Sequence, residues 1–147
     1  MKWLLDTNVI SESVRPRPNI TVQSWVEARE PELALSVVTL AELRDGASTL
    51  SDAARRLRFD RWITEIVIPR FGGRTFALTL DILTDFMALA RRLGARGRPQ
   101  SAPDLLLAAT TRRHGLILVT RNTRDFANTG ITVYNPWTDE THKMETP

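Results

Sequence analysis

Short apolar segments alternate with helical patterns along this chain, and this alternation limits the possible fold more than any other feature. Each segment has the length of a buried strand and is bounded by polar residues. The segments are Trp3 to Leu5, Leu33 to Val38, Leu116 to Val119 and Ile131 to Tyr134. No long hairpin pattern joins them. Strands that alternate with helices predict an α/β fold, with a mainly parallel central sheet and helices on both of its faces.

Apolar residues recur at helical spacing between these predicted strands. One helix is expected behind a cap at or near Thr39, with Glu42 in its first turn. An apolar stripe predicts another helix over residues 59–67. Asp81 suits the cap or first turn of a third helix, which ends near Gly94. Asp81 is therefore expected to have a structural role.

Length and composition exclude several classes of protein. A chain of 147 residues fits one domain, expected over residues 1–138 and followed by a polar, frayed tail over residues 139–147. The chain has no cysteine, which excludes disulfides and thiolate metal sites. Its first apolar run is too short for a signal peptide, and no apolar stretch reaches the roughly 18 residues needed to span a membrane. A cytoplasmic protein without a membrane function is expected.

The basic residues are almost all arginine. The formal net charge is +3, and only Lys2 and Lys143 among the 20 basic residues are lysine. Arginine binds phosphate through two parallel hydrogen bonds and stacks on bases, which suits a nucleic-acid surface. A GC-rich genome is the favoured explanation of the bias as a whole, because it acts on every codon and needs no selection for binding. Individual arginines must therefore be judged by their positions.

Four acids lie where apolar segments meet polar turns: Asp6, Glu42, Asp104 and Asp125. Asp6 ends the first apolar run, and the next residues, Thr7 and Asn8, can turn the chain into a helix. Asp104 follows Pro103 in the first turn of a helix expected to run to Arg113. Open α/β sheets bind their ligands beyond the carboxyl ends of the strands. We expect the four acids to converge at that edge.

A cluster of acids predicts a metal site for a hard cation. Carboxylates that lie close together repel one another unless a cation or a proton compensates. Magnesium and manganese prefer carboxylate oxygens, whereas zinc prefers histidine and cysteine, of which the chain has two and none. One or two such ions can activate water and stabilise charge on a phosphodiester. Singly, each acid is also explained as a helix cap or a solvated side chain; the hypothesis rests on the set.

Five segments carry a resemblance to a known family. In chain order they are LLDTNVISE, SVVTLAELRDG, APDLLLAAT, LILVTRNTRDF and VYNPW. Together they resemble the PIN-domain family, specifically the VapC and FitB-like toxins, from Met1 to about Thr138. The resemblance implies a PIN-like α/β fold and a magnesium- or manganese-dependent endoribonuclease of a type II toxin–antitoxin module. It also implies a homodimer and inhibition by a cognate VapB- or FitA-like antitoxin.

The resemblance assigns roles to particular residues. Asp6, Glu42 and Asp104 match the first three metal-binding acids of the family. The fourth acid matches either Asp125 or the position of Asn122 in different relatives, and Asp125 is favoured because an amide supplies no charge. The acids are expected to serve as both metal ligands and catalytic residues.

Other residues are expected to support the acids or to contact substrate. The resemblance implies that Asn8, Thr120 and Asn122 orient the carboxylates through hydrogen bonds, although they serve equally as turn residues. Arginines near the acids are the candidate RNA contacts: Arg96, Arg98, Arg121 and Arg124. Trp25 and Trp62 are expected in the core, with an antitoxin groove as the alternative.

Two other functions fit parts of the pattern. A haloacid-dehalogenase-like phosphatase also has an aspartate after its first strand, but it needs a second aspartate where this chain has Asn8. A non-catalytic PIN-like module would bind RNA or a partner without cutting, yet the first three acids are all present. The RNA, the number of metal ions and the antitoxin class remain open at this stage.

Overall fold

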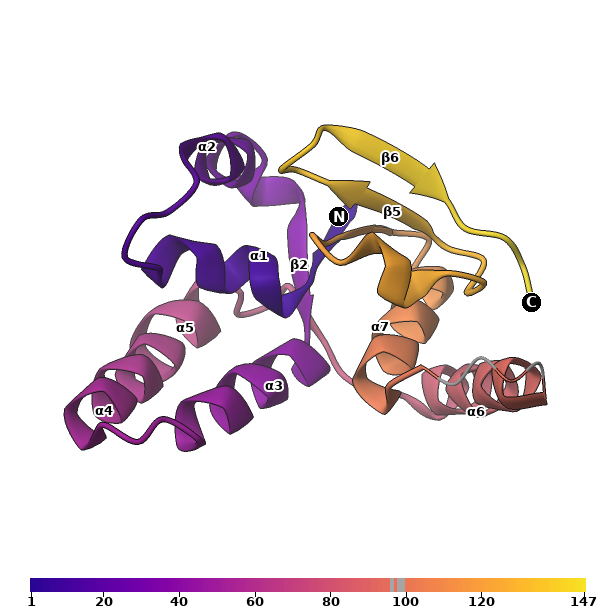
Figure 1. Cartoon of the computed structure of the whole chain (residues 1–147), viewed down its shortest axis with the longest axis horizontal. Helices are drawn as coiled ribbons and strands as arrows, with labels where there is room; N and C mark the ends of the chain where they lie inside the picture. The colour runs from indigo at the N-terminus through magenta and orange to yellow at the C-terminus, as the bar shows by residue number, and fades with distance from the viewer. Residues whose placement is uncertain (96, 98–99) are drawn as a thin grey trace.

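A six-stranded sheet forms the centre of the molecule (Figure 1). The structure is a computed structural model that describes residues 1–95, 97 and 100–147. Its strands follow the spatial order β3-β2-β1-β4-β5-β6, and only the β5–β6 pair is antiparallel. The strands are β1 (Trp3–Leu5), β2 (Leu33–Ser36), β3 (Thr75–Phe76), β4 (Ile117–Val119), β5 (Thr132–Asn135) and β6 (Glu140–Lys143). The expected mainly parallel α/β sheet is confirmed.

Helices connect the parallel strands. The α-helices are α1 (Thr7–Ser11), α2 (Ile20–Ala28), α3 (Val37–Ser48), α4 (Ala53–Trp62), α5 (Ile68–Arg70), α6 (Leu80–Ala95) and α7 (Ala102–Arg113). Shorter helical turns are η1 (Glu12–Val14), η2 (Glu30–Glu32), η3 (Ile63–Val67) and η4 (Thr123–Phe126), of which η3 is a single π-helical segment. Among the described residues no helix is long and apolar enough to cross a membrane.

Alternating side chains of the strands build two separate cores. Leu5 of β1 and Val119 of β4 pack with α1, α2, α3 and the η3 segment on one face. Leu4 and Leu118, which directly precede those residues, pack with α6 and α7 on the other face. Leu4 of β1 lies in register with Leu118 of β4, so the alternation stays in phase across the sheet. Both faces are covered, as the continuous apolar runs predict.

The tryptophans belong to the first of these cores. Trp25 is buried, stacks on Tyr134 and meets the ring of Trp3 edge-on at 5.1 Å between centroids. Trp62 packs against the same core from α4. Core packing, the expected role of Trp25 and Trp62, is confirmed. An antitoxin groove cannot use the buried Trp25 ring without opening this core.

The chain after residue 138 differs from the expected frayed tail. Residues Glu140–Lys143 form β6, which pairs with the whole of β5. A tight turn makes the pairing possible, because Asp139 adopts φ 59° and accepts a hydrogen bond from the Tyr134 hydroxyl at 2.9 Å. The polar composition was misleading because all four residues of β6 are exposed at the edge of the sheet, where backbone pairing alone holds the strand.

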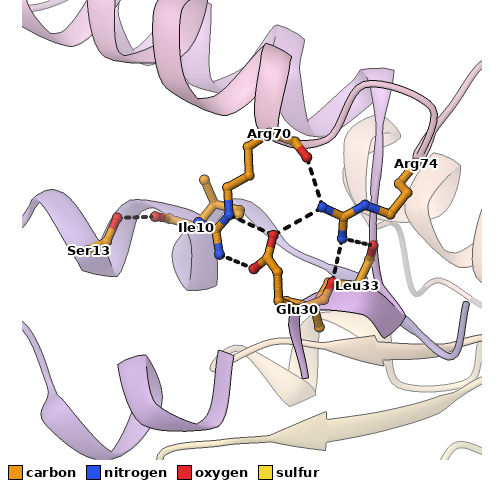
Figure 2. Close-up of polar contacts among 6 residues, drawn as sticks. All are labelled: Ile10, Ser13, Glu30, Leu33, Arg70 and Arg74. Atoms are coloured by element: carbon orange, nitrogen blue, oxygen red, sulfur yellow. Dashed lines mark hydrogen bonds and ion pairs between the residues drawn. The ribbon is translucent and has the colours of Figure 1, made fainter. Parts of the chain in front are cut away.

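A partly exposed charge network fixes the start of β2 (Figure 2). Arg70 and Arg74 converge on the Glu30 carboxylate, with Arg74 Nη2 3.0 Å from Glu30 Oε1. Arg74 also donates to the backbone carbonyls of Glu30, Leu33 and Arg70. Hydrogen bonds from Arg70 hold the pKa of Glu30 below its usual value, against the raising effect of burial. Arg74 thus joins β2, α5 and the entry to β3.

We expect Arg74→Ala to lower the free energy of unfolding by about 2 kcal/mol, because it leaves several backbone carbonyls without their donor. Arg70→Ala is the matched control. Arg70 is more exposed, and its side chain contacts only Glu30 in this network, so its loss should cost about 1 kcal/mol or less. Urea unfolding of both variants checks the difference. Equal losses would show that the bonds to the carbonyls contribute nothing beyond the ion pair.

Candidate active site

Asp6 lies at the carboxyl end of the central strand β1. Its backbone is extended, and its Oδ1 accepts a hydrogen bond from the Thr7 amide at 2.7 Å, which caps α1. The Asp6 amide donates to the Val119 carbonyl of β4 at 2.9 Å. The residue is only 7% exposed. The strand and the cap together hold the carboxylate at the edge of the sheet.

Two polar side chains contact the other oxygen of Asp6, and a third residue, Asn122, supports one of them. The fully buried Thr120 donates from its hydroxyl to Asp6 Oδ2 at 2.7 Å, and Asn8 Nδ2 donates to the same oxygen at 3.2 Å. Asn8 Nδ2 also lies 3.2 Å from Thr120 Oγ1, and Asn122 donates its backbone amide to that hydroxyl at 3.0 Å. The carboxylate is therefore fixed in orientation by residues from both β1 and β4 ends.

Glu42 approaches Asp6 from helix α3. Its Oε1 accepts a hydrogen bond from the Thr7 hydroxyl at 3.2 Å. The expectation that Glu42 lies in the first turn is wrong: Ser36, rather than Thr39, caps the helix by accepting from the Val38 amide, and α3 begins at Val37. Glu42 is thus in the second turn, where the positive charge of the helix terminus no longer favours its ionised form.

Asp104 lies in the first turn of α7, as expected. Ser101 caps this helix, and the Asp104 amide donates to its Oγ at 3.3 Å. Pro103 occupies one of the first two helical positions, where its missing amide hydrogen costs nothing. His114 and Gly115 close the helix, with Gly115 at φ 62°. Asp104 is half-buried.

Asp125 reaches the site from the turn after β4. Its amide donates to the Asn122 carbonyl at 3.1 Å within η4. Its side chain is exposed. Asn122 precedes η4 and is also exposed. Of the two alternatives for the fourth position, Asp125 is the one that interacts electrostatically with other acids of the cluster.

The carboxylates of the four acids lie near enough to one another to interact electrostatically. Burial raises the pKa of Asp6 above its usual value, and the Asp125 carboxylate adds to this, against hydrogen bonds from Thr120, Thr7 and Asn8 that lower it. Burial likewise raises the pKa of Glu42, and repulsion from Asp6 and Asp104 raises it further. The hydrogen bond from Thr7 lowers it.

Asp104 follows the same pattern. Burial is the largest cause of its raised pKa, the Ser101 hydroxyl opposes it, and the carboxylates of Asp6 and Asp125 raise it further. Three of the four acids are therefore harder to ionise than free carboxyls because negative charge is concentrated in a partly dry place. Such a cluster favours a bound cation.

The acids do not form a ready-made cage. In the described part of the chain, no three His, Cys, Asp or Glu side chains form a group that could hold a metal ion by themselves. This fits the preference of magnesium, which is usually bound by one or two carboxylates, with waters and substrate phosphates completing its octahedron. The donor chemistry, all oxygen and strongly negative, suits that class of ion.

Two residues of the site were not singled out from the sequence. Thr7 bridges Asp6 and Glu42, because its amide donates to the first and its hydroxyl to the second. Its place next to Asp6 is the only sequence signal, and that position alone predicts a turn residue. Ser101 caps α7 and lies three residues before Asp104, a spacing typical of capping.

The predicted RNA-contact arginines divide between different surfaces. Arg121 and Arg124 are both exposed near the acids, but they line separate hollows. Arg121 lies over the ring of Trp137, whereas Arg124 faces the side of β6. Arg96 and Arg98 lie outside the described residues.

An apolar hollow of about 660 Å³ opens beside the acids. Its apolar lining includes Val37, Val38, Leu78 and Leu106, and Glu42 and Asp45 also line it. One of the four acids, Glu42, therefore borders the hollow, and Pro103, the residue before Asp104, lines it as well.

Comparison with known proteins identifies the family. The sequence model of the PIN-domain family matches residues 3–131 of the chain. The chain belongs to the PIN-domain family. Toxin FitB of Neisseria gonorrhoeae is 34% identical to this PIN domain over 92% of the chain and 99% of its own length. VapC ribonuclease Y4jK of Sinorhizobium fredii is 35% identical over 91% of the chain and 96% of its own length. The resemblance in the five sequence segments is confirmed.

Solved structures agree with this membership. The crystal structure of FitAcB from Neisseria gonorrhoeae contains a chain with a TM-score of 0.83 and 32% identity, covering 92% of this PIN domain and 98% of that chain. The β1 and β4 edges that carry Asp6 and Thr120 are therefore parts of a shared PIN fold.

We expect Thr120→Val to reduce any activity that depends on Asp6 by roughly tenfold. The substitution keeps shape and burial but removes the 2.7 Å hydrogen bond to Asp6 Oδ2. A tenfold loss of activity is small for a residue that orients a metal-binding carboxylate. It is expected here because Asn8 and the Thr7 amide still contact Asp6. The measurement is the initial rate of RNA cleavage at saturating manganese.

Two variants control for this substitution. Thr120→Ser retains the hydroxyl and should keep most of the rate. Thr111→Val removes another buried threonine hydroxyl, bonded only to the Leu107 carbonyl of its own helix, and should leave the rate nearly unchanged. A Thr120→Val rate equal to that of the parent would show that Asp6 needs no orienting hydroxyl.

Proposed function

We propose that this PIN domain is the toxin of a type II toxin–antitoxin module and acts as a divalent-metal-dependent endoribonuclease. The observation that carries the proposal is the convergence of four carboxylates at the carboxyl edge of β1 and β4, where burial and repulsion disfavour the ionised forms of Asp6, Glu42 and Asp104. A site with that penalty is explained by a cation that binds there. The toxin FitB and VapC ribonuclease names of the two relatives support the substrate class.

Each acid has a proposed role in this reaction. Asp6 and Asp104 would hold Mg²⁺ or Mn²⁺, with Glu42 and Asp125 completing the negative field and binding through water. When bound, the ion supplies an activated water and stabilises charge on the phosphodiester. Thr120 and Asn8 hold the Asp6 carboxylate still, so the reacting groups are positioned before substrate arrives. The half-buried surroundings of Glu42 and Asp104 limit bulk water.

Inhibition of the nuclease by an antitoxin is part of the proposal. A toxin that cuts its own cell's RNA has to be held inactive, so we propose a cognate antitoxin and, from the family resemblance, a homodimeric toxin. The apolar hollow bounded by Leu78 and Leu106 supports this, because a segment bound there would lie against Glu42 and against Pro103, the residue before Asp104. A basic side chain on that segment would compete with the metal for the same carboxylates.

The first experiment is cleavage of total cellular RNA by antitoxin-free protein in manganese, in magnesium and in EDTA. The expected result is a set of discrete fragments in both metals and none in EDTA. The Asp6→Asn variant, checked for folding by circular dichroism, should give no fragments. Fragment ends then identify the RNA that is cut.

Two results would contradict the proposal. Folded, antitoxin-free protein that binds Mn²⁺ but cleaves no RNA would favour the non-catalytic binding module. Cleavage that survives both EDTA and Asp6→Asn would come from a contaminating nuclease.

A further inference from the structure

A second hollow, of about 470 Å³, lies on the side of the acids where β4 ends. Its basic and aromatic lining residues are Arg15, Arg17, Arg121 and Trp137. We call the surface that these four residues line the arginine hollow. The Arg121 guanidinium lies over the Trp137 ring, with its carbon 5.2 Å from the ring centroid. Segments far apart in the sequence therefore bring three cations and an indole to one concave surface.

One acid also lines the arginine hollow, but it leaves the surface basic. Glu12 is buried at 4% exposure and accepts the backbone amide of Asn19 at 2.9 Å, which holds the loop after η1. It lies 3.5 Å from Arg15 Nη1, at the limit of a hydrogen bond, and the Arg15 side chain remains 59% exposed. A charge balance of three arginines against one acid remains.

Direct bonds connect the arginine hollow to the acidic cluster. The Arg121 amide donates to Asn8 Oδ1 at 3.1 Å, and the other end of the same Asn8 amide donates to Asp6 Oδ2. Arg121 also follows Thr120, whose hydroxyl bonds Asp6. Arg121 of the arginine hollow is therefore bonded to the same Asn8 side chain that contacts the Asp6 carboxylate.

We propose that the arginine hollow binds the single-stranded RNA segment next to the scissile phosphodiester, with a phosphate on Arg15 and Arg17 and a base stacked at Trp137. This inference rests on the proposed nuclease function and names where its substrate is held. The acidic cluster repels a polyanion, so a cationic anchor beside it lowers the cost of bringing a phosphate to Asp6.

The aromatic component favours RNA over an acidic protein segment. Carboxylates would use the arginines alone, whereas unpaired bases also stack on aromatic rings and guanidinium planes. The Arg121–Trp137 pair offers both planes in one place. A double helix does not expose its base faces, which is why the proposed segment is single-stranded.

The test measures binding of a fluorescein-labelled, mixed-sequence single-stranded oligoribonucleotide by anisotropy across a range of salt concentrations. All proteins carry Asp6→Asn, which prevents cleavage during the titration. The test variant is Arg15→Ala/Arg17→Ala. The matched control is Arg55→Ala/Arg58→Ala, which removes two exposed arginines from α4 that do not line the arginine hollow.

The expected result is a lower salt dependence for the test variant only. If each arginine contacts one phosphate, the slope of log K against log salt should fall by about 1.4 in magnitude, and affinity at low salt should fall by tenfold or more. Trp137→Leu should weaken binding on the order of tenfold, and Trp137→Phe much less. Because Trp137 also packs on the core, urea unfolding must show that both variants fold.

The active protein gives an independent readout. With intact Asp6, Arg15→Ala/Arg17→Ala should raise KM for the cleaved RNA and leave kcat near that of the parent, because neither residue touches the reacting atoms. A fall in kcat at unchanged KM would overturn the assignment of these arginines to substrate binding.

Other outcomes overturn the proposal in distinguishable ways. If the double variant matches the control in both affinity and slope while the parent still cuts RNA, the proposed function stands and the arginine hollow does not hold substrate. If it retains RNA affinity but loses affinity for the antitoxin, the arginine hollow is a partner surface. If the parent neither binds nor cuts RNA, both proposals fail together.

Discussion

Asp104→Asn is expected to reduce RNA cleavage by about 10³-fold while improving the stability of the metal-free protein. The asparagine keeps the shape of the side chain and can still accept from Ser101, but it removes a charge from the acidic cluster. Loss of a metal-binding carboxylate removes several kcal/mol of charge stabilisation, and each 1.36 kcal/mol is tenfold in rate. Stability changes in the other direction, because burial and repulsion from Asp6 and Asp125 disfavour the ionised aspartate.

Graded controls make this expectation specific. Asp125→Asn should cost less, on the order of tenfold to 100-fold, because Asp125 is exposed and is proposed to bind through water. Asp81→Asn, in the first turn of α6, removes an exposed first-turn aspartate elsewhere and should leave the rate unchanged. Single-turnover rates in manganese and urea unfolding in EDTA provide the two measurements. A large loss of activity with an equally large loss of stability would indicate misfolding instead of a chemical role.

The sequence was sufficient to place Asp6 and Asp104 locally, because the first follows a strand and the second starts a capped helix. Asp6 ends an apolar run, and Asp104 follows Pro103 in a cap pattern, so both local structures were predictable. Parallel strands then bring their carboxyl ends to one edge without any further information. The convergence of these distant residues is a consequence of topology.

Other features depended on tertiary contacts that no local pattern shows. Helix α3 begins at Val37 because Ser36 caps it, although the β-branched residues Val37 and Val38 favoured a longer strand. The β6 strand has no buried residue and forms only because β5 offers an edge. The arginine hollow brings residues 15 and 17 next to residues 121 and 137, which follow them by more than 100 positions in the sequence.

The two charge clusters of this protein should respond to pH in opposite directions. The folded pKa of Glu30 is lowered, so its contribution to stability is present above the unfolded value of 4.5 and is lost as pH falls toward the folded value. The folded pKa values of Asp6, Glu42 and Asp104 are raised, so the folded state binds more protons than the unfolded state just above pH 3.8 to 4.5. Stability contributed by these acids therefore falls as pH rises through that window.

Metal binding should reverse this penalty near neutral pH. A cation that binds only the folded, ionised cluster stabilises it by about 2.7 kcal/mol at 100 times its dissociation constant, which is roughly 5 to 10 °C in Tm for a domain of this size. We expect Mn²⁺ to raise Tm by that amount at neutral pH and by much less near pH 4, where protons compete for the same carboxylates.

The Asp104→Asn variant separates this effect from general salt stabilisation. In EDTA the variant should be more stable than the parent, and this difference in Tm should be largest near neutral pH. It should shrink as the pH approaches 4, because protonation of Asp104 in the parent removes the cost of its buried charge. In Mn²⁺ the order should invert, since the parent gains the metal and the variant gains little. An equal Tm shift in parent and variant would place the metal elsewhere on the protein, and the burial of these carboxylates would then require another explanation.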